Sequence, residues 1–264
     1  MKVQKGEIVA ARKYSENLYK LEIFSPYICK NARPAQFVNV RCAGFESNDP
    51  LLRRPFCIYE IDKKFNVFSI LFIVKGKGTA YMANLEKGEI LDFVGPLGNG
   101  FNIPENKNKF LLLGGGIGVA PLCLIAQNLI ENNKTVHFVA GFKDETFYVW
   151  ERDLIKILRD YRIFSENGAF GEKGLPSEYI YNSLDTFKEY QFLVCGPLEM
   201  LKNIQSILRG RKINALALME EKMACGIGTC MGCVLRIKNK NGDIQYKKIC
   251  TDGPVFDLME VCFD

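Results

Sequence analysis

The chain has 264 residues, of which 48% are hydrophobic and 25% charged, and its formal net charge is +5. This length predicts two or three domains, and the composition is that of a globular protein with sizeable cores. The basic residues are scattered and no apolar run reaches the length of a membrane span, so we expect neither nucleic-acid nor membrane binding. The first residues lack the apolar core of a signal peptide. Ten cysteines without such a signal predict a cytoplasmic protein with a metal or redox role.

Residues 1–102 are expected to form a small antiparallel β-barrel that binds a cofactor. Their apolar segments are short, rich in Val, Ile and Phe, and separated by polar or Gly/Pro turns, as in small barrels. The stretch 95–100 is rich in Gly, ends this pattern and predicts a domain boundary. The strands are expected at residues 8–12, 18–24, 37–41, 56–61, 67–74 and 90–94, with one short helix at 79–85.

Two stretches of the barrel have the chemistry to hold a phosphate. Arg53 and Arg54 lie at the start of an expected strand, and an arginine there can pair with a phosphate through two hydrogen bonds. Residues 76–79 precede the short helix, whose first N–H groups can bind an anion. Taken alone, the first stretch is more simply a surface arginine pair, and the second a capped turn.

Residues 103–213 alternate strands with helices, which predicts a parallel sheet covered by helices. The strands are expected at residues 110–113, 136–140, 162–165 and 192–195. Helices are expected from a glycine-rich turn to residue 130, at 150–158 and at 198–208. His137 is the only histidine and lies inside an expected strand. We interpret it as a structural residue and expect no histidine-based hydrolysis.

Two turns of this sheet are candidate nucleotide sites. The sequence from Gly114 to Pro121 follows a buried strand and opens a helix, whose exposed N–H groups suit a pyrophosphate. It departs from the G-x-G-x-x-G fingerprint because Val119 stands where the third glycine would be, so an ordinary tight turn is the alternative. Cys195-Gly-Pro ends another strand, at the edge where open α/β sheets bind ligands. A buried structural cysteine is the alternative there.

Residues 214–264 are expected to be a small unit that binds a [2Fe–2S] cluster. Its cysteines follow the C-x4-C-x2-C…C spacing of plant-type clusters, which four thiolates hold. The ligands are expected to be Cys225, Cys230, Cys233 and Cys250. Zinc and a disulfide framework are the alternatives, although zinc sites usually combine two C-x2–4-C pairs.

The sequence around these cysteines predicts a tight loop followed by a hairpin. Gly226, Gly228 and Gly232 can adopt positive φ and leave room for backbone N–H groups to approach the sulfurs. Asn241-Gly242 predicts a hairpin turn between strands at residues 234–238 and 244–248.

Taken together, these motifs resemble the ferredoxin–NADP reductase superfamily. The segment Met223–Cys233, with Cys250-Thr-Asp-Gly-Pro-Val-Phe, is similar more narrowly to the electron transfer subunits of class 1B dihydroorotate dehydrogenases. The resemblance covers essentially the whole chain. It implies FAD on the barrel, NAD in the α/β domain and the [2Fe–2S] cluster near the C-terminus. It also implies a partner, a separate FMN-containing catalytic subunit that oxidises dihydroorotate, in a heterotetramer.

The resemblance also assigns site residues by position. It implies three FAD motifs: Arg54, Pro55, Phe56 and Cys57; Leu71, Phe72 and Ile73; and Gly78 and Thr79. On the nicotinamide side it implies Gly115, Gly116, Gly118, Cys195 and Gly196. This chain departs from the family at Cys57, where serine is usual, and at Ile73, where arginine is frequent. A thiol is a weaker donor than a hydroxyl, so we expect flavin binding to differ from that in relatives.

The expected function is electron transfer from the partner subunit through the cluster and FAD to NAD⁺, in pyrimidine biosynthesis. We expect no catalytic residue in this chain, because the cofactors carry the chemistry. Asp144 and Glu145 follow the second strand of the α/β domain and predict a preference for NAD over NADP. The alternatives are a related iron–sulfur flavoprotein reductase subunit, linked to ferredoxin or sulfide, and a non-catalytic redox sensor.

Overall fold

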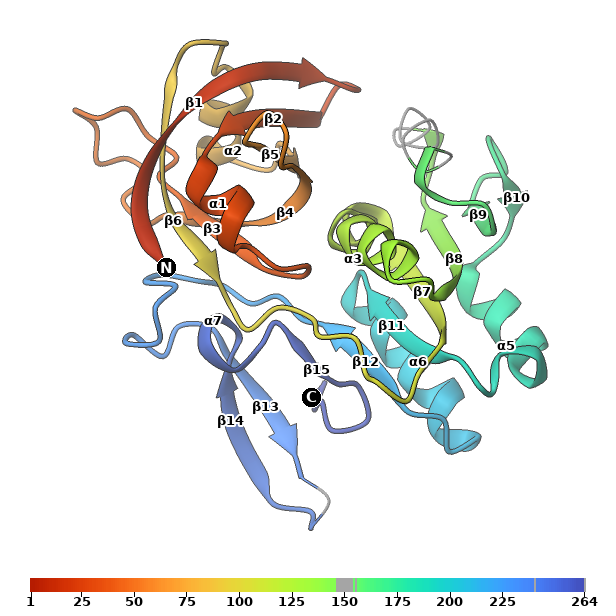
Figure 1. The fold of residues 1–264 in the computed structure, drawn as a ribbon. Coiled ribbons are helices and arrows are strands. Elements are labelled where there is room, and N and C mark those ends of the chain that lie inside the picture. Colours follow the sequence, from red (N-terminus) through yellow and green to blue (C-terminus); the bar gives the residue numbers. More distant parts are fainter. Residues whose placement is uncertain (146–153, 155, 240, 264) are drawn as a thin grey trace. The chain divides into compact units, whose positions relative to one another are not determined.

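The structure is a computed structural model that describes residues 1–145, 154, 156–239 and 241–263. The chain folds into two compact units, and each is assembled from three stretches of sequence (Figure 1). The first contains Met1–Phe101, Glu220–Val234 and Lys248–Pro254. The second contains Asn102–Met219, Leu235–Lys247 and Val255–Asp264.

The first unit is built on a closed antiparallel barrel with the strand order β1-β2-β5-β4-β3-β6. Alternate side chains fill its interior, and Phe68 and Phe93 meet there edge to face with ring centres 5.3 Å apart. The predicted barrel is therefore confirmed. Its elements are β1 (Lys2–Lys13), β2 (Leu18–Phe24), α1 (Pro26–Asn31), β3 (Phe37–Val40), β4 (Arg54–Asp62), β5 (Val67–Ile73), α2 (Lys77–Ala83) and β6 (Ile90–Leu97).

Strand β1 is longer than the sequence predicts because it belongs to two pairs. Residues 2–7 pair with β6, and residues 8–13 pair with β2. The first half is mostly exposed and lacks an apolar alternation, so its backbone pairing leaves little trace in the sequence. Helix α1 was also not predicted. It begins at Pro26, and the Ser25 side chain caps it by accepting from the Ile28 N–H.

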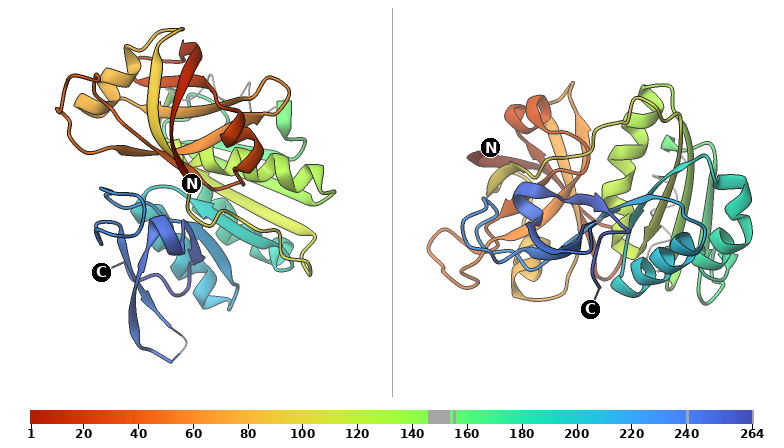
Figure 2. Two further views of the ribbon diagram at one scale, coloured as in Figure 1. Left: turned by 60° about the vertical axis from the view of Figure 1, so that its left-hand side comes forward. Right: turned by 90° about the horizontal axis from the view of Figure 1, so that it is seen from below.

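The second unit is an α/β sheet with the order β10-β9-β8-β7-β11-β12-β15. Its strands are parallel except for β15, which pairs antiparallel with β12. Helix α3 covers one face, whereas α5 and α6 cover the other (Figure 2). The elements are β7 (Lys109–Gly115), η1 (Gly116–Gly118), α3 (Val119–Glu131), β8 (Thr135–Phe142), β9 (Tyr161–Ser165), β10 (Glu172–Lys173), α5 (Pro176–Phe187), β11 (Gln191–Cys195), α6 (Leu198–Gly210), β12 (Ala215–Leu218) and β15 (Val255–Asp257).

Strands β7 and β8 form the buried centre of this sheet, and the predicted parallel sheet is confirmed. From Phe110 onward β7 is buried along its whole length, as expected for a strand covered on both faces. The predicted helix at 150–158 falls mostly on residues outside the described part. Helix α5 and strands β10, β12 and β15 were not predicted.

Residues 214–264, predicted to form one small unit, divide between the two units. Strands β13 (Val234–Lys238) and β14 (Ile244–Lys248) form the predicted hairpin, and helix α7 (Ile249–Asp252) follows it. The cysteine loop and α7 belong to the barrel unit, while most of the hairpin and β15 belong to the α/β unit. A separate domain at 214–264 thus stays a prediction.

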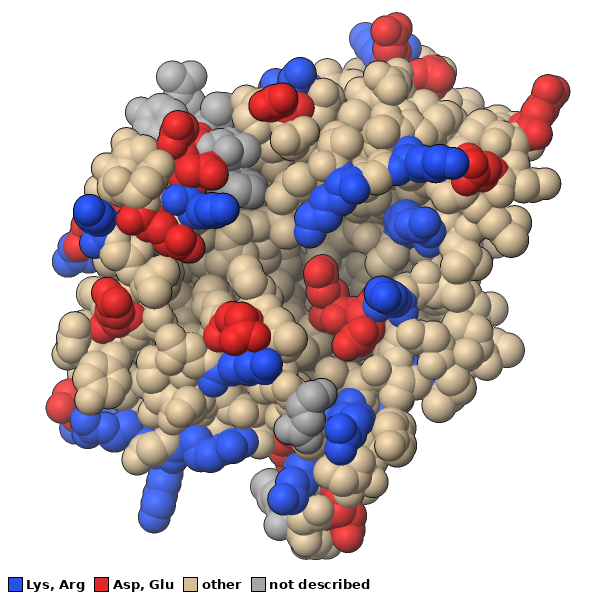
Figure 3. Space-filling view, turned by 180° about the vertical axis from the view of Figure 1, so that it is seen from behind, with Lys and Arg blue, Asp and Glu red and all other residues tan. Residues whose placement is uncertain are grey.

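The surface and the helices offer two further observations. No helix within the described ranges is long and apolar enough to cross a membrane. On the face that Figure 3 shows, Lys and Arg side chains are interspersed with Asp and Glu side chains over most of the surface.

Candidate cofactor sites

The four cysteines stand as two pairs in the barrel unit. Cys225 donates its N–H to Cys230 Sγ at 3.5 Å, and the two side chains also hydrogen-bond. Cys233 and Cys250 are buried, with their sulfurs 3.3 Å apart. Within the described residues, no three His, Cys, Asp or Glu side chains converge closely enough to coordinate a single metal ion. Two pairs of thiols match the needs of a binuclear cluster, which takes two protein ligands on each iron.

Backbone N–H groups point at the sulfurs, as expected for a thiolate site. Ile227 N–H donates to Cys225 Sγ at 3.4 Å, and Gly232 N–H donates to Cys230 Sγ at 3.4 Å. Burial alone raises the pKa of the Cys225 thiol, but the bonds from Ile227 and neighbouring N–H groups outweigh it and lower that pKa to about 6. Burial, followed by the interaction with Cys233, raises the pKa of Cys250 to about 12.

Two of the three predicted loop glycines have the backbone conformation that requires glycine. Gly226 has φ +72° and Gly228 has φ +89°. Gly232 does not have positive φ. Instead, the preceding Met231 takes φ +58°, so the expected positive φ of Gly232 was wrong, whereas the expected approach of its N–H to a sulfur is confirmed. Gly232 still lies close to its neighbour, because a Cβ there would be 3.3 Å from Cys230 Sγ.

Two residues that the sequence did not single out hold the loop in place. Lys248 Nζ donates to Gly228 O at 2.8 Å, which ties the loop to the start of α7. Asn39 of β3 donates through Nδ2 to Ala224 O at 3.1 Å. An isolated Lys or Asn has no spacing pattern, so nothing in the sequence points to either role.

On the barrel, the structure brings Arg54 and Gly78 together. A Cβ at Gly78 would meet Cys42 Cβ at 3.0 Å, Pro50 Cγ at 3.5 Å and Arg54 Cγ at 3.7 Å. The Arg54 guanidinium donates to Leu52 O at 2.7 Å, which fixes its position beside the start of α2. A charged fork and the first N–H groups of a helix thus share one side of the barrel.

The side chains of Thr79 and Arg53 form hydrogen bonds within the barrel unit. Thr79 Oγ1 accepts from Lys75 N–H at 2.8 Å and Gly76 N–H at 3.1 Å, so its hydroxyl shapes the turn before α2. Arg53 pairs with Asp92 at 2.7 Å and also donates to Asp92 O. Of these two arginines, Arg53 therefore has a structural role in linking the start of β4 to β6, and Arg54 is the candidate for binding a phosphate.

The first and second predicted FAD motifs meet across β4 and β5. Phe56 and Phe72 are in edge-to-face contact at 5.7 Å, and Tyr19 stacks on Phe72 at 6.0 Å. Burial, with a smaller effect of the Glu220 carboxylate, raises the pKa of Cys57 to about 12, so this thiol stays protonated. Pro55 lies between Arg54 and Phe56 in β4, and Leu71 and Ile73 flank Phe72 in β5.

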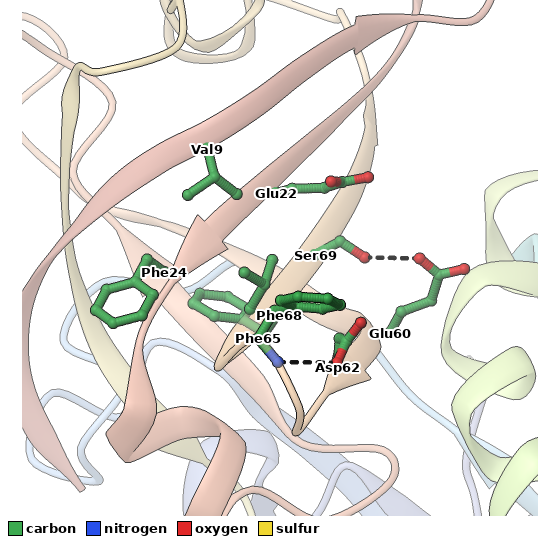
Figure 4. A pocket seen from close by; sticks show the side chains of 9 residues that line it. Val9, Glu22, Phe24, Glu60, Asp62, Phe65, Phe68 and Ser69 are labelled. Carbon is green, nitrogen blue, oxygen red and sulfur yellow. Dashed lines mark hydrogen bonds between the residues drawn. The ribbon is translucent and has the colours of Figure 1, made fainter.

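A pocket of about 490 Å³ elsewhere on the barrel contains none of these residues (Figure 4). Its carboxylates already have partners within the barrel. Glu60 accepts from Ser69 Oγ at 3.2 Å and pairs with Lys20. Asp62 accepts from the N–H groups of Lys64 and Phe65. We therefore assign no cofactor to this pocket.

In the α/β unit, the predicted nicotinamide residues converge at the carboxyl ends of β7 and β11. A Cβ at Gly118 would lie 2.6 Å from Cys195 O, and one at Gly196 would lie 3.1 Å from Gly115 N. The two turns therefore touch through their backbones. Gly116 has φ +53° and no neighbour within 4 Å of a Cβ, so its backbone faces open space.

His137 and the acidic residues lie at opposite ends of β8. His137 Nδ1 is 2.9 Å from Asp160, and its Nε2 is 3.1 Å from Tyr179 OH, which supports a structural role. At the other end, Asp144 and Glu145 follow Phe142, the last residue of the strand. Asn167 holds Glu145 by a bond of 3.1 Å at the edge that carries the glycine turn.

Comparisons with known proteins point to one family. Residues 220–262 match the family model for the iron–sulfur cluster binding domain of dihydroorotate dehydrogenase B. A relative from Desulforamulus reducens is 34% identical and is aligned over 100% of this chain and 99% of its own length. One from Bacillus cereus is 35% identical over 99% of each chain. Both are named dihydroorotate dehydrogenase B (NAD(+)), electron transfer subunit.

Solved structures are similar as well. An NADH-dependent reduced ferredoxin-NADP oxidoreductase structure, described for flavin-based electron bifurcation, has a TM-score of 0.86 and 29% identity. The similarity covers 98% of this chain and 90% of that one. Phthalate dioxygenase reductase has a TM-score of 0.64 and 14% identity over 93% of this chain and 76% of its own, which shows a shared fold.

We predict that Gly226→Ala prevents normal cluster binding. The new Cβ would lie 2.9 Å from Asn39 Nδ2, and the positive φ adds about 1–2 kcal/mol of strain. Iron and acid-labile sulfide per chain should fall well below those of the unaltered protein. Gly44→Ala is the matched control, because a Cβ there has no neighbour within 4 Å. Full iron and sulfide in Gly226→Ala would contradict the geometry described above.

Proposed function

Since the chain belongs to the family of electron transfer subunits of NAD-dependent dihydroorotate dehydrogenase B, we propose that it carries electrons from a separate FMN-containing catalytic subunit through a [2Fe–2S] cluster and FAD to NAD⁺ in pyrimidine biosynthesis. The observation that carries this proposal is the arrangement of the four thiols in two pairs, with backbone N–H groups directed at the sulfurs. They lie in the segment that matches the cluster-binding family model.

The cofactors supply the redox chemistry, in which a cluster moves single electrons, a flavin moves one or two, and a nicotinamide takes up hydride. The protein supplies binding, orientation and electrostatics. Arg54 and the Gly78 turn would hold the FAD pyrophosphate. Phe56 and Phe72 would line the FAD-binding surface of the barrel. Cys57 offers a protonated thiol there, which can donate a weak hydrogen bond.

The nicotinamide cofactor would bind where the two backbone turns of the α/β unit meet. Gly115, Gly116 and Gly118 present the start of α3, and Cys195 and Gly196 present the end of β11. This is the edge of an open α/β sheet at which ligands bind. The close approach of the two turns fixes their shape before any ligand arrives.

Dihydroorotate oxidation itself is proposed to require the partner subunit. The only histidine, His137, already contacts Asp160 and Tyr179, and no residue of this chain is assigned a role as acid or base. In the absence of the partner subunit, this chain should still pass electrons from NADH to artificial dyes.

The cysteine loop is the proposed contact with that partner. Residues 224–232 contain no charged side chain, and Ile227 and Met231 are 47% and 54% exposed. Interface cores are depleted in charge and enriched in Met, and a cluster must come close to its electron donor. We propose a heterotetramer with two copies of each subunit.

A related reductase subunit is the second candidate function. The similarity to an NADH-dependent reduced ferredoxin-NADP oxidoreductase, at a TM-score of 0.86, favours it over a non-catalytic sensor. The two candidates differ in the protein that delivers electrons. Co-purification from the native host separates them, because the first requires a dihydroorotate dehydrogenase and the second a ferredoxin-linked flavoprotein.

The direct test of the proposed function combines metal analysis with reconstitution. Anaerobically purified protein should contain about two iron and two sulfide per chain, and its flavin and cluster absorbance should bleach with NADH. Adding the catalytic subunit should restore dihydroorotate-dependent reduction of NAD⁺. Stoichiometric zinc without sulfide would contradict the cluster, and reconstitution without activity would contradict the partner.

Arg54→Ala is expected to lower FAD content strongly, because it removes the only cation assigned to the pyrophosphate. Losing a charge-assisted bond of about 1.5–3 kcal/mol weakens binding roughly 10- to 150-fold. Flavin absorbance after gel filtration measures the effect, and far-UV circular dichroism checks the fold. Arg12→Ala removes an exposed barrel arginine and should retain FAD. Equal FAD in both variants would rule out this role of Arg54.

NADH should be preferred over NADPH. Asp144 and Glu145 would repel a 2′-phosphate, and a like-charge contact on the order of 1.4 kcal/mol corresponds to about tenfold in kcat/KM. Lys143 is adjacent and exposed, and its positive charge would attract a 2′-phosphate once the carboxylates are neutralised. The double substitution Asp144→Asn and Glu145→Gln should therefore reduce or reverse the preference for NADH over NADPH. Steady-state dye reduction with each cofactor decides the matter, and a higher kcat/KM for NADPH in the unaltered protein would overturn the prediction.

A charge in the cysteine loop should weaken assembly. Ile227→Glu or Met231→Glu would bury an unpaired carboxylate in the proposed interface, which typically costs several kcal/mol. We expect reduced co-purification of the catalytic subunit and unchanged NADH-dependent dye reduction. Phe65→Glu, at an exposed turn of the barrel, is the control. Normal assembly of the loop variants, with no protection of residues 224–232 from hydrogen exchange, would place the contact elsewhere.

A further inference from the structure

Asn39 is a fully buried polar residue between the barrel and the cysteine loop. It lies in β3 with 0% of its surface exposed. Its Nδ2 donates to Ala224 O at 3.1 Å, and the same nitrogen would lie 2.9 Å from a Cβ at Gly226. Ala224 and Gly226 flank Cys225. The Asn39 amide therefore contacts the loop on both sides of the first cysteine.

The other side-chain atom of Asn39 makes this position costly. Its Oδ1 is buried and has no hydrogen-bond partner among the described residues. An unsatisfied buried acceptor costs about 1–3 kcal/mol. Exchanging the two amide atoms would not help, because Oδ1 would then face the Ala224 carbonyl, another acceptor. Its sequence neighbours Val38 and Val40 are fully buried but point to the opposite face of β3, so Asn39 is the residue of this stretch that faces the cysteine loop.

The backbone of Asn39 is fixed by the strands on both sides. It lies opposite Pro55 of β4, within the proposed FAD motif, and opposite Val94 of β6. Its carbonyl also accepts from the Arg53 guanidinium at 3.5 Å, and Arg53 is itself paired with Asp92. One residue thus joins the strand of the proposed FAD motif to the loop that carries the cluster ligands.

We propose that Asn39 is a positioning residue that sets the geometry of the cluster loop relative to the barrel, an inference that rests on the proposed function. Holding Ala224 and Gly226 orients the peptide groups on either side of Cys225. The Cys225 N–H donates to Cys230 Sγ, and the Ile227 N–H, two residues further along the chain, donates to Cys225 Sγ. Hydrogen bonds to the sulfurs tune the reduction potential of a cluster. Asn39 therefore acts on that potential through the loop, without touching the metal.

The test is Asn39→Leu, which removes the donor and the unsatisfied acceptor together and keeps a similar volume. We expect shifted g values of the dithionite-reduced cluster in electron paramagnetic resonance and a shifted midpoint potential. Release of iron to a chelator should be about fivefold faster, the equivalent of one hydrogen bond. FAD content should be unchanged. Asn39→Asp is the second variant, and it should show larger shifts because it turns an acceptor toward Ala224 O.

A matched control separates positioning from simple stability. Ser25 is also buried in the barrel unit and bonds Gln4 and Ile28. Ser25→Ala should lower the unfolding midpoint and leave the cluster signals unchanged. If both Asn39 variants kept the g values, potential and iron-release rate of the unaltered protein, the inference would be overturned. A lack of iron and sulfide in the unaltered protein would overturn the proposed function, and this inference with it.

Discussion

The close approach of the cysteine loop to the barrel is the constraint on which the rest of the cluster site depends. Four soft ligands must face inward while the backbone N–H groups between them also turn toward the sulfurs. A loop this short achieves both only if something outside it fixes its path. The Asn39 amide fixes it at Ala224 and Gly226, and Lys248 fixes it at Gly228. Glycine is favoured against Asn39, because its φ is positive and a Cβ at Gly226 would lie only 2.9 Å from the amide nitrogen and 3.2 Å from Leu97 Cδ1.

The α/β unit uses the same device for a different purpose. Gly118 lies against the carbonyl of Cys195, and Gly196 lies against the backbone of Gly115. Glycine is needed there because two turns touch each other, and only Gly116 faces open space. The glycines of this motif thus meet two different requirements: some let one backbone pack against another, and one leaves room for a ligand. The sequence shows only that glycines are clustered there, and it does not show which glycine meets which requirement.

Much of the fold was predictable from the sequence, because apolar alternation and strand–helix alternation reflect burial directly. β2 and the β13–β14 hairpin match the predicted bounds, whereas the polar half of β1 does not, since a strand held by backbone pairing needs no apolar pattern. The spacing of the four cysteines predicted that they act together in one site, whereas their arrangement as two pairs is visible only in the structure. The supports of the loop did not, because Asn39 is distant in the chain and its role arises only from tertiary packing. Gly232 was misjudged for a related reason, since Met231 takes the left-handed conformation.

The interleaving of the two units along the chain has a consequence for how the protein can be dissected. Each unit draws on three separate stretches, so no single cut releases either one intact. A truncation at Met219 would remove the cysteines and also β15, which pairs with β12 at the edge of the sheet. It would leave the amide of Gln205 without its acceptors Leu258 O and Val261 O. Transfer of the cluster segment to another protein, by recombination or by protein engineering, would therefore have to supply replacements for these contacts as well as the cysteines.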